Sequence, residues 1–404
     1  MSRLDVNSIR HTDGSADNIT LDGSKNVTCE NNLQVDGNVT VTGTIPADKL
    51  TGTLPAISGA NLTGISSAGK AHNLMVNGSF IVAQRGISST DSGYKTVDRF
   101  AYYKAGTQTQ SQAAIASATS GPYASGFRKC YKVANGSNTA GNTDAATFQY
   151  TIEDQDLACS GWNHTDPNSK LTLSFWARSS VAQTFYFQIR TKHGTNQGYW
   201  SSYALSANTW TKVTKTIPGY ANIELANDTG QGFNLSWNLY YGTDSTGSGG
   251  LAENTWGAFA GGTSTPDQTN TWQNTNAATF ELTGVQLETG DSATDFAHKS
   301  YGDELLRCQR YYQVDRSSNV NSMYEAASTY NGKWYQKDHT VEMRAKPTVS
   351  TANGTNGISN SGWTGSTPTP YSSNTHTVYY SSGNAFHLAG TSDGNIGATY
   401  DSEL

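Results

Sequence analysis

The sequence predicts an all-β protein, and three observations lead to this fold class. Only 14% of the 404 residues are charged, whereas glycine occurs 41 times and tyrosine 22 times, together with many Ser, Thr and Asn residues. Such a composition favours strands and turns over long helices. The first 70 residues repeat short glycine-ended segments, and longer aromatic segments follow from about residue 73 without a comparably strong helical pattern between them.

The N-terminal region, residues 1–70, repeats a unit of one short strand and one turn, which we interpret as a shaft. The units are NITLDG (18–23), NVT (26–28), LQVDG (33–37), NVTVTG (38–43), TGTIP (42–46), TGTLP (51–55) and LTG (62–64). Val39 and Val41 alternate with threonines, the period of a strand with one buried face. So short a strand cannot bury its apolar side alone, so we expect several chains to share it, most simply as a trimer. A flexible linker is the alternative.

Residues 71–299 are predicted to form an antiparallel β-sandwich of the jelly-roll kind. Its expected strands are aromatic segments separated by loops rich in Gly, Asn and Ser. After an initial segment at 73–86, they lie at 99–103, 147–152, 171–178, 184–190, 210–218, 233–241 and 280–288. Because these strands do not alternate with helices, the pattern favours a sandwich over a parallel α/β sheet.

One short helix is expected at residues 300–313, as a connector to a small C-terminal β domain at 314–404. Ser300 and Asp303 have the spacing of an N-terminal capping box, and an apolar stretch follows them. The C-terminal domain returns to short strand patterns at 341–349, 376–380 and 385–388.

The composition argues against several classes of function. The net charge is −6, and no cluster of Lys and Arg is interleaved with aromatic residues, so we expect no nucleic-acid binding. No apolar run reaches about 18 residues and no basic-then-apolar stretch opens the chain, which predicts neither membrane insertion nor a signal peptide. The widely separated Cys29, Cys130, Cys159 and Cys308 predict free thiols rather than a zinc or redox site.

The sequence predicts no catalytic centre, so we expect a protein that is not an enzyme. Cleavage of a glycosidic bond usually requires two carboxylates that flank the substrate. The clustered acids show no spacing that would place two of them so; they are Glu153, Asp154, Asp156, Glu281 and Glu288. The eight histidines form no H-x-x-x-H pair and have no local link to a nucleophile. An EF-type calcium loop is also absent, so no metal ligand is assigned.

Strand alternation predicts the residues of a binding surface. If the strands at 171–178, 184–190 and 233–241 belong to one sheet, their outward residues form one aromatic and hydrogen-bonding face. This predicted glycan site contains Trp176, Arg178, Tyr186, Gln188, Arg190, Asn238 and Tyr240. A sugar ring packs its C–H face on an aromatic plane, while amide and guanidinium groups match its hydroxyls. The alternative is that this face packs against a neighbouring protomer or a loop.

Several stretches of the chain resemble known families. GVQLE at 284–288, FAHKSYGDELLRCQRYYQ at 296–313, RAKPTV at 344–349 and the terminal DSEL are similar to a segment that recurs in bacteriophage tail-fibre proteins. LTLSFWAR and FELTGVQLE resemble strands of the carbohydrate-binding jelly rolls found in glycan-degrading enzymes and phage fibres. Together the similarities cover about residues 73–404.

The resemblance implies a homotrimeric virion tail fibre, assembled in the cytoplasm of the bacterial host, with the shaft at residues 1–70 as its virion-attachment region. Its implied partners are other tail or baseplate proteins and a host-surface glycan, which it binds without turnover. It also allows a structural calcium ion without assigning ligands. Two alternatives stay open: a purely structural connector or decoration protein of the capsid or tail, and a polysaccharide depolymerase.

Overall fold

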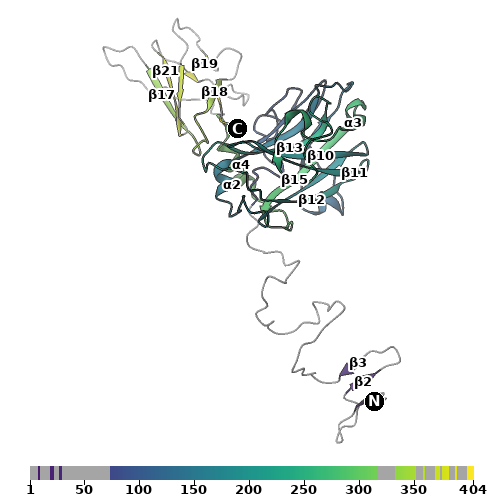
Figure 1. The fold of residues 1–404 in the computed structure, drawn as a ribbon. Helices are drawn as coiled ribbons and strands as arrows, with labels where there is room; N and C mark the ends of the chain where they lie inside the picture. Colours follow the sequence, from purple (N-terminus) through teal and green to yellow (C-terminus); the bar gives the residue numbers. More distant parts are fainter. Residues whose placement is uncertain are drawn as a thin grey trace. The chain divides into compact units, whose positions relative to one another are not determined.

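A computed structural model describes residues 73–315 continuously, together with 8–9, 19–21, 27–29, 333–351, 358–359, 369–373, 375–381, 387–388 and 398–404. The chain divides into two compact units, Met1–Ile65 and Ser66–Leu404 (Figure 1). Within the described residues, no helix is both long and apolar enough to cross a membrane.

The first unit contains a small antiparallel sheet. Its strands are β1 (Ser8–Ile9), β2 (Ile19–Leu21) and β3 (Val27–Cys29), in that order. Strands β2 and β3 coincide with the first two predicted repeat units. The later units, from 33–37 to 62–64, lie outside the described residues, so their sharing between chains stays a prediction.

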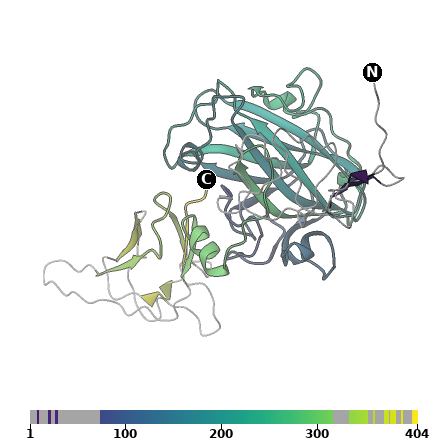
Figure 2. The same ribbon diagram turned by 90° about the horizontal axis from the view of Figure 1, so that it is seen from below.

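The second unit is built around two six-stranded antiparallel sheets that pack as a sandwich, which confirms the predicted fold class (Figures 1 and 2). The first, the β10 sheet, has the order β14 (Gly257–Ala258), β11 (Gln197–Leu205), β10 (Gln183–Thr191), β13 (Gln231–Tyr241), β8 (Ala145–Glu153) and β5 (Phe100–Tyr103). The second, the β9 sheet, has the order β12 (Thr211–Pro218), β9 (Lys170–Ser179), β15 (Thr279–Thr289), β7 (Lys129–Ala134), β6 (Thr109–Ala114) and β4 (Ser88–Ser89).

The core lies between the sheets and follows the alternation of the strands. Phe175 of β9 and Trp237 of β13 meet there, with ring centroids 6.0 Å apart and planes at 90°. Both side chains are fully buried. Burial of one such large apolar side chain stabilises the fold by about 1.5–3 kcal/mol. The inward residues of each strand therefore serve the core, and the outward residues are left for other contacts.

Residues 73–86, expected to open the sandwich as a strand, form bends and turns instead. Asn77 and Phe80 have positive φ angles of 62° and 56°, which an extended strand does not contain. The Asn73 side chain bonds the backbone of β15, donating to the Val285 carbonyl at 3.0 Å and accepting from the Leu287 N–H at 3.0 Å. Side-chain bonds thus replace a ladder in this buried segment.

The longest helix among the described residues, α4 (Tyr301–Gln309), is the predicted connector, although it is shorter than expected. The Ser300 hydroxyl accepts from the Asp303 N–H at 3.1 Å, as the capping pattern predicts. Residues 310–313 are not part of it, because β16 begins at Tyr312. The short helices α1 (Gly121–Ala124), α2 (Asp154–Ala158) and α3 (Thr271–Asn274) and the 3₁₀ turn η3 (Gly261–Thr263) lie in connections of the sandwich.

The described residues of the C-terminal part form three small antiparallel sheets. Their strand orders are β16 (Tyr312–Asp315), β23 (Ala398–Asp401) and β18 (Thr348–Thr351); β17 (Lys333–Asp338), β21 (His376–Ser381) and β20 (Thr369–Ser372); and β19 (Ile358–Ser359) with β22 (His387–Leu388). Of the predicted strand at 341–349, only the end from Thr348 is extended, because the Arg344 guanidinium and N–H bond surrounding carbonyls.

Residues after β23 return to the sandwich through charged contacts. The Glu403 carboxylate pairs with Arg99, which is fully buried, and with Arg85 at 3.4 Å. Arg310, which follows α4, makes a two-pronged contact of 2.7 and 2.8 Å with Glu153 at the end of β8. These ion pairs join the C-terminal strands to the sandwich.

Candidate functional site

The structure distributes the seven predicted site residues over both sheets, so they do not form one face. Trp176 and Arg178 belong to β9, whereas Tyr186, Gln188 and Arg190 belong to β10, and Asn238 and Tyr240 to β13. Strand β9 pairs with β12 and β15, not with β10. The condition that all three strands share a sheet is therefore not met.

Tyr240 was expected to point outward, and this is wrong. A bulge between Asn238 and Tyr240 shifts the register, so that Asn238 pairs with Thr147 and Tyr240 pairs with Ala146. Tyr240 consequently packs in the core and is 6% exposed. Tyr241 takes its place on the outer side, where burial raises the pKa of its phenol. An extra residue in a strand reverses the alternation beyond it.

The predicted residues of β10 hold a long connection, residues 242–268, against the outer face of their sheet. Gln188 donates to the Ser264 carbonyl at 3.3 Å, and the Arg190 guanidinium lies 4.3 Å from the centre of the Phe259 ring. The remaining space above Gln188 is a small cavity of about 160 Å³. The outer face of β10 is therefore covered by the protein's own chain at Gln188 and Arg190.

Tyr186 and Asn238, the other predicted site residues on the outer face of this sheet, also contact residues of the same chain. The rings of Tyr186 and Trp200 lie 5.8 Å apart, and burial raises the pKa of the Tyr186 phenol. Asn238 is fully buried and accepts a hydrogen bond from the Thr147 hydroxyl at 3.0 Å. Neither side chain stands free on an open surface.

Arg178, on the other sheet, is engaged by an acid. Its guanidinium bonds the Glu281 carboxylate, and this bond raises the pKa of Arg178. The same group lies 5.1 Å from the centre of the Trp210 ring. Arg178 therefore belongs to a local charge cluster next to Trp176.

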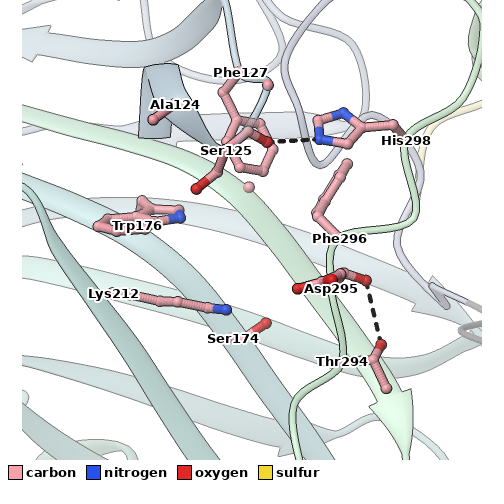
Figure 3. A pocket seen from close by; sticks show the side chains of 12 residues that line it. Ala124, Ser125, Phe127, Ser174, Trp176, Lys212, Thr294, Asp295, Phe296 and His298 are labelled. Atoms are coloured by element: carbon pink, nitrogen blue, oxygen red, sulfur yellow. Dashed lines mark hydrogen bonds between the residues drawn. The ribbon is translucent and has the colours of Figure 1, made fainter. Parts of the chain in front are cut away.

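Trp176 lines an open pocket of about 460 Å³ on the outer face of the β9 sheet (Figure 3). Strands, α1 with its following loop and the connection after β15 all contribute to it. Its lining residues are Ala124, Ser125, Gly126, Phe127, Ser174, Trp176, Lys212, Gly284, Thr294, Asp295, Phe296 and His298. The volume lies in the range of small-molecule sites.

Strand alternation places the polar residues of the floor beside the indole. Ser174 and Trp176 are two residues apart on β9 and so share its outer face. Lys212 of β12 is the direct cross-strand partner of Trp176. Trp176 is partly exposed and packs against the small cluster around Phe127. An aromatic plane, a hydroxyl and an ammonium group thus meet on one surface.

Three rings, Phe127, Phe296 and His298, form one end of the pocket, here named the aromatic corner. Phe127 lies 4.8 Å from Phe296 and 4.9 Å from His298 between ring centroids, and Phe296 lies 4.9 Å from His298. A ring nitrogen of His298 contacts the Ser125 carbonyl at 3.0 Å. The corner therefore ties the loop after α1 to the connection after β15.

The aromatic corner depends on a glycine in the middle of β15. Gly284 lies in a bulge between Thr283 and Gln286 and has a φ of +62°. A Cβ atom there would meet Phe127 Cζ at 2.6 Å. Glycine satisfies both the left-handed backbone and the close approach of the ring.

The connection that carries Asp295, Phe296 and His298 is fixed by Gln286, which is fully buried. The Gln286 amide accepts from the Ala297 N–H at 2.8 Å and donates to the Glu288 carboxylate at 3.0 Å. Glu288 in turn accepts from the Thr294 N–H at 2.9 Å. A rigid strand thereby positions a loop that would otherwise be free to move.

Two groups of opposite charge face the cavity without an ion pair to a described residue. In Figure 3, Lys212 and the Trp176 ring lie on one side, while Asp295 and Phe296 lie on the other. Both charged residues are exposed. Asp295 is the one carboxylate among the lining residues. The pocket offers a donor, an acceptor and aromatic planes to a ligand.

Of these residues, the sequence pointed to Trp176 alone. Lys212 could have been found, since it alternates outward along the predicted strand at 210–218. The glycine at 284, inside a predicted strand, was a signal of a bulge. Nothing local in Asp295 or Phe296 indicates that they join α1, because that contact depends on the tertiary fold.

Comparison with known proteins finds low-scoring structural similarities, which include carbohydrate-binding modules and a phage tailspike domain. No protein-family model matches the chain, and no curated protein matches it. Among solved structures, the enzymatically active domain of tailspike protein 4 of bacteriophage CBA120 is similar, with 12% identity and a TM-score of 0.29, over 54% of this chain and 21% of that one.

Two bacterial sugar-binding structures are similar at the same level. A putative sugar-binding protein from Bacteroides thetaiotaomicron has 10% identity and a TM-score of 0.29, over 54% of this chain and all of that one. The N-terminal cellulose-binding domain of Cellulomonas fimi β-1,4-glucanase C has 12% identity and a TM-score of 0.26, over 53% and 99% of the two chains. These scores are low, so no functional statement is drawn from them.

Proposed function

We propose that this protein binds a host-surface glycan without cleaving it, and that the pocket around Trp176 holds a sugar unit. The observation that carries the proposal is the partly exposed Trp176 ring in a cavity that is also lined by Lys212 and Asp295, neither of which forms an ion pair with a described residue. A pyranose offers one apolar face to an aromatic ring, while its hydroxyls accept from an ammonium and donate to a carboxylate.

The absence of turnover is part of this proposal. Most glycoside hydrolases place two carboxyl groups about 5–10 Å apart around the bond that they break. The described lining of the Trp176 pocket contains Asp295 alone as an acid. Incubation with host polysaccharide should therefore release no new reducing ends, and their steady release would identify a depolymerase instead.

The wider role that we propose is that of a homotrimeric tail fibre, located in the virion and attached to other tail or baseplate proteins. The short strands at the start of the chain and the fibre-like segments around α4 support this role. Light scattering of the full chain should give three times the 43.2 kDa of one chain. A monomer would contradict the shared shaft.

The glycan proposal is tested by binding of the full chain to a glycan array and to host cells. Trp176→Ala should weaken binding by about tenfold or more, because a stacked aromatic contact is lost. Arg190→Ala is the matched control: it removes a large side chain from the opposite sheet, where Phe259 covers it. Equal binding of the wild-type protein and Trp176→Ala would overturn the assignment of the pocket.

A structural connector is the second candidate, and one observation favours it. Ser264 and Phe259 cover the outer face of β10 at Gln188 and Arg190, and ion pairs fix the C-terminal strands to the sandwich. A sandwich fixed in this way can connect two other proteins without binding a ligand. A protein that binds no glycan but is required for particle assembly would favour this role.

A further inference from the structure

We infer that the Trp176 pocket selects an N-acetylated amino sugar over the parent hexose and over charged sugars. This inference rests on the proposed glycan binding and adds the chemical class of the ligand. The geometry points to it through three features of the pocket: its balance of charge, its aromatic corner and the position of the Trp176 indole across the cavity from Phe296.

The charged groups of the pocket favour a ligand without net charge. Lys212 and Asp295 face the cavity from different sides, and neither forms an ion pair within 4.0 Å with a described residue. A uronic acid would be attracted to Lys212 but repelled by Asp295, and a protonated amino sugar would meet the reverse situation. A neutral group with both a donor and an acceptor satisfies both sides.

An acetamido group has this pair of functions on adjacent atoms. Its carbonyl accepts a hydrogen bond, as the Lys212 ammonium requires, and its N–H donates one, as the Asp295 carboxylate requires. A hexose hydroxyl supplies either function, but it carries no apolar end. The third part of the acetamido group, its methyl, therefore distinguishes the two ligands.

The aromatic corner provides an apolar surface for that methyl. Phe127 is 2% exposed and is held against Gly284, so the corner has a fixed floor. Phe296 and His298 form its side and are more accessible. A methyl group transferred from water onto such rings gains about 0.8 kcal/mol. Asp295 precedes Phe296 directly, which places the acceptor beside the apolar surface.

Trp176 is available for the sugar ring itself while the corner holds the substituent. Figure 3 shows the indole across the cavity from Phe296, with Ser174 and Lys212 on the floor below. A pyranose stacked on Trp176 therefore directs a substituent at one carbon toward the corner. The cavity of about 460 Å³ suits one substituted sugar unit rather than an extended chain.

The test measures binding of four soluble sugars to the full chain by ligand-observed NMR and calorimetry: N-acetylglucosamine, glucose, glucosamine and glucuronic acid. We expect N-acetylglucosamine to bind about fourfold more tightly than glucose, and more tightly than the two charged sugars. Phe296→Ala should remove this preference while weak binding of all neutral sugars persists. Lys212→Met and Asp295→Asn should each weaken N-acetylglucosamine binding and raise relative binding of the sugar whose charge is no longer opposed.

Matched variants keep the result interpretable. Lys95→Met and Asp291→Asn remove the same charges from exposed positions outside the pocket lining and should change nothing. Equal binding of all four sugars, abolished by Trp176→Ala, would overturn the inference and leave the proposed function standing. Absence of any sugar binding, with host adsorption unaffected by Trp176→Ala, would overturn both.

Discussion

The Glu403 carboxylate bonds the guanidinium of Arg99, a side chain with no exposed surface. Arg99 also donates to the Thr151 carbonyl at 2.6 Å and lies 3.4 Å from the centre of the Tyr311 ring. Burial is the largest single effect on the pKa of Arg99 and lowers it, but the negative charge of Glu403 and the nearby tyrosines together outweigh burial, so the pKa is raised. One acid therefore neutralises a cation that has no access to water.

Removal of this acid should strongly destabilise the protein. Glu403→Gln removes the negative charge that balances the positive charges of Arg99 and Arg85. Loss of one partner of a buried ion pair lowers the free energy of unfolding by about 3–5 kcal/mol. Urea unfolding followed by tryptophan fluorescence measures the loss. Glu224→Gln, at an exposed position, is the control. An unchanged unfolding midpoint in Glu403→Gln would show that the pair contributes nothing.

Asp98 should give the stability a characteristic pH dependence. Burial raises its pKa from 3.8 to about 6, despite the opposing charge of Arg85. The folded protein thus holds this proton more tightly than the unfolded chain, so stability from Asp98 is full below pH 4 and lost as the pH rises through 6. The loss is about 3 kcal/mol.

Asp98→Asn removes this titration, so the wild-type protein should lose stability relative to the variant between pH 4 and 6. Chemical denaturation at several pH values measures the difference. Asp91→Asn, at an exposed position, should follow the wild-type curve. Parallel curves for the wild-type protein and Asp98→Asn would contradict the raised pKa.

Gly284→Ala should damage both the fold and the pocket. The left-handed backbone costs a non-glycine residue about 1–3 kcal/mol, and contact with Phe127 adds about 1–3 kcal/mol of overpacking. Gly290→Ala is the control, since it also has a positive φ but no atom within 4 Å of the added Cβ. Only Gly284→Ala should reduce sugar binding; an equal effect of both variants would rule out the steric argument.

The cysteines should differ sharply in reactivity. Burial raises the pKa of Cys130 to about 12 and that of Cys308 well above its ordinary value. Cys159 is exposed. Because the thiolate is the reactive form, iodoacetamide should label Cys159 in the native protein and the other two only after unfolding. Peptide mapping by mass spectrometry identifies each site, and rapid native labelling of Cys130 would contradict its burial.

Aromatic and β-branched strands could be predicted from the sequence, but several polar strands could not. The segment 171–178 alternates apolar residues cleanly and corresponds to β9. Strands β6 and β7, in contrast, have the sequences TQSQAA and KCYKVA, and β11 has the sequence QGYWSSYAL, which lacks β-branched residues. These strands are extended because neighbouring strands pair with them, and a local pattern does not contain that information.

The candidate site shows the same limit. Alternation correctly placed Trp176 and Gln188 on outer faces. It could not show that these faces belong to different sheets, because strand pairing depends on residues that are far apart in the sequence. At Tyr240 a single bulge reversed the prediction. Bulges and loop contacts, such as that of Phe127 with Phe296, depend on the whole fold. They therefore cannot be predicted from residues that are neighbours in the sequence.

The connection at 242–268 makes the two outer faces of the sandwich different. It lies over β10, whereas the β9 sheet carries the open Trp176 pocket. Phe259 and Ser264 lie over β10. A neighbouring molecule that binds this side of the sandwich leaves the Trp176 pocket open. A neighbour on the β9 side would compete directly with a ligand for Trp176 and Lys212. A contact with another protein through the β10 sheet therefore leaves the Trp176 pocket accessible to a ligand, whereas a contact through the β9 sheet blocks it.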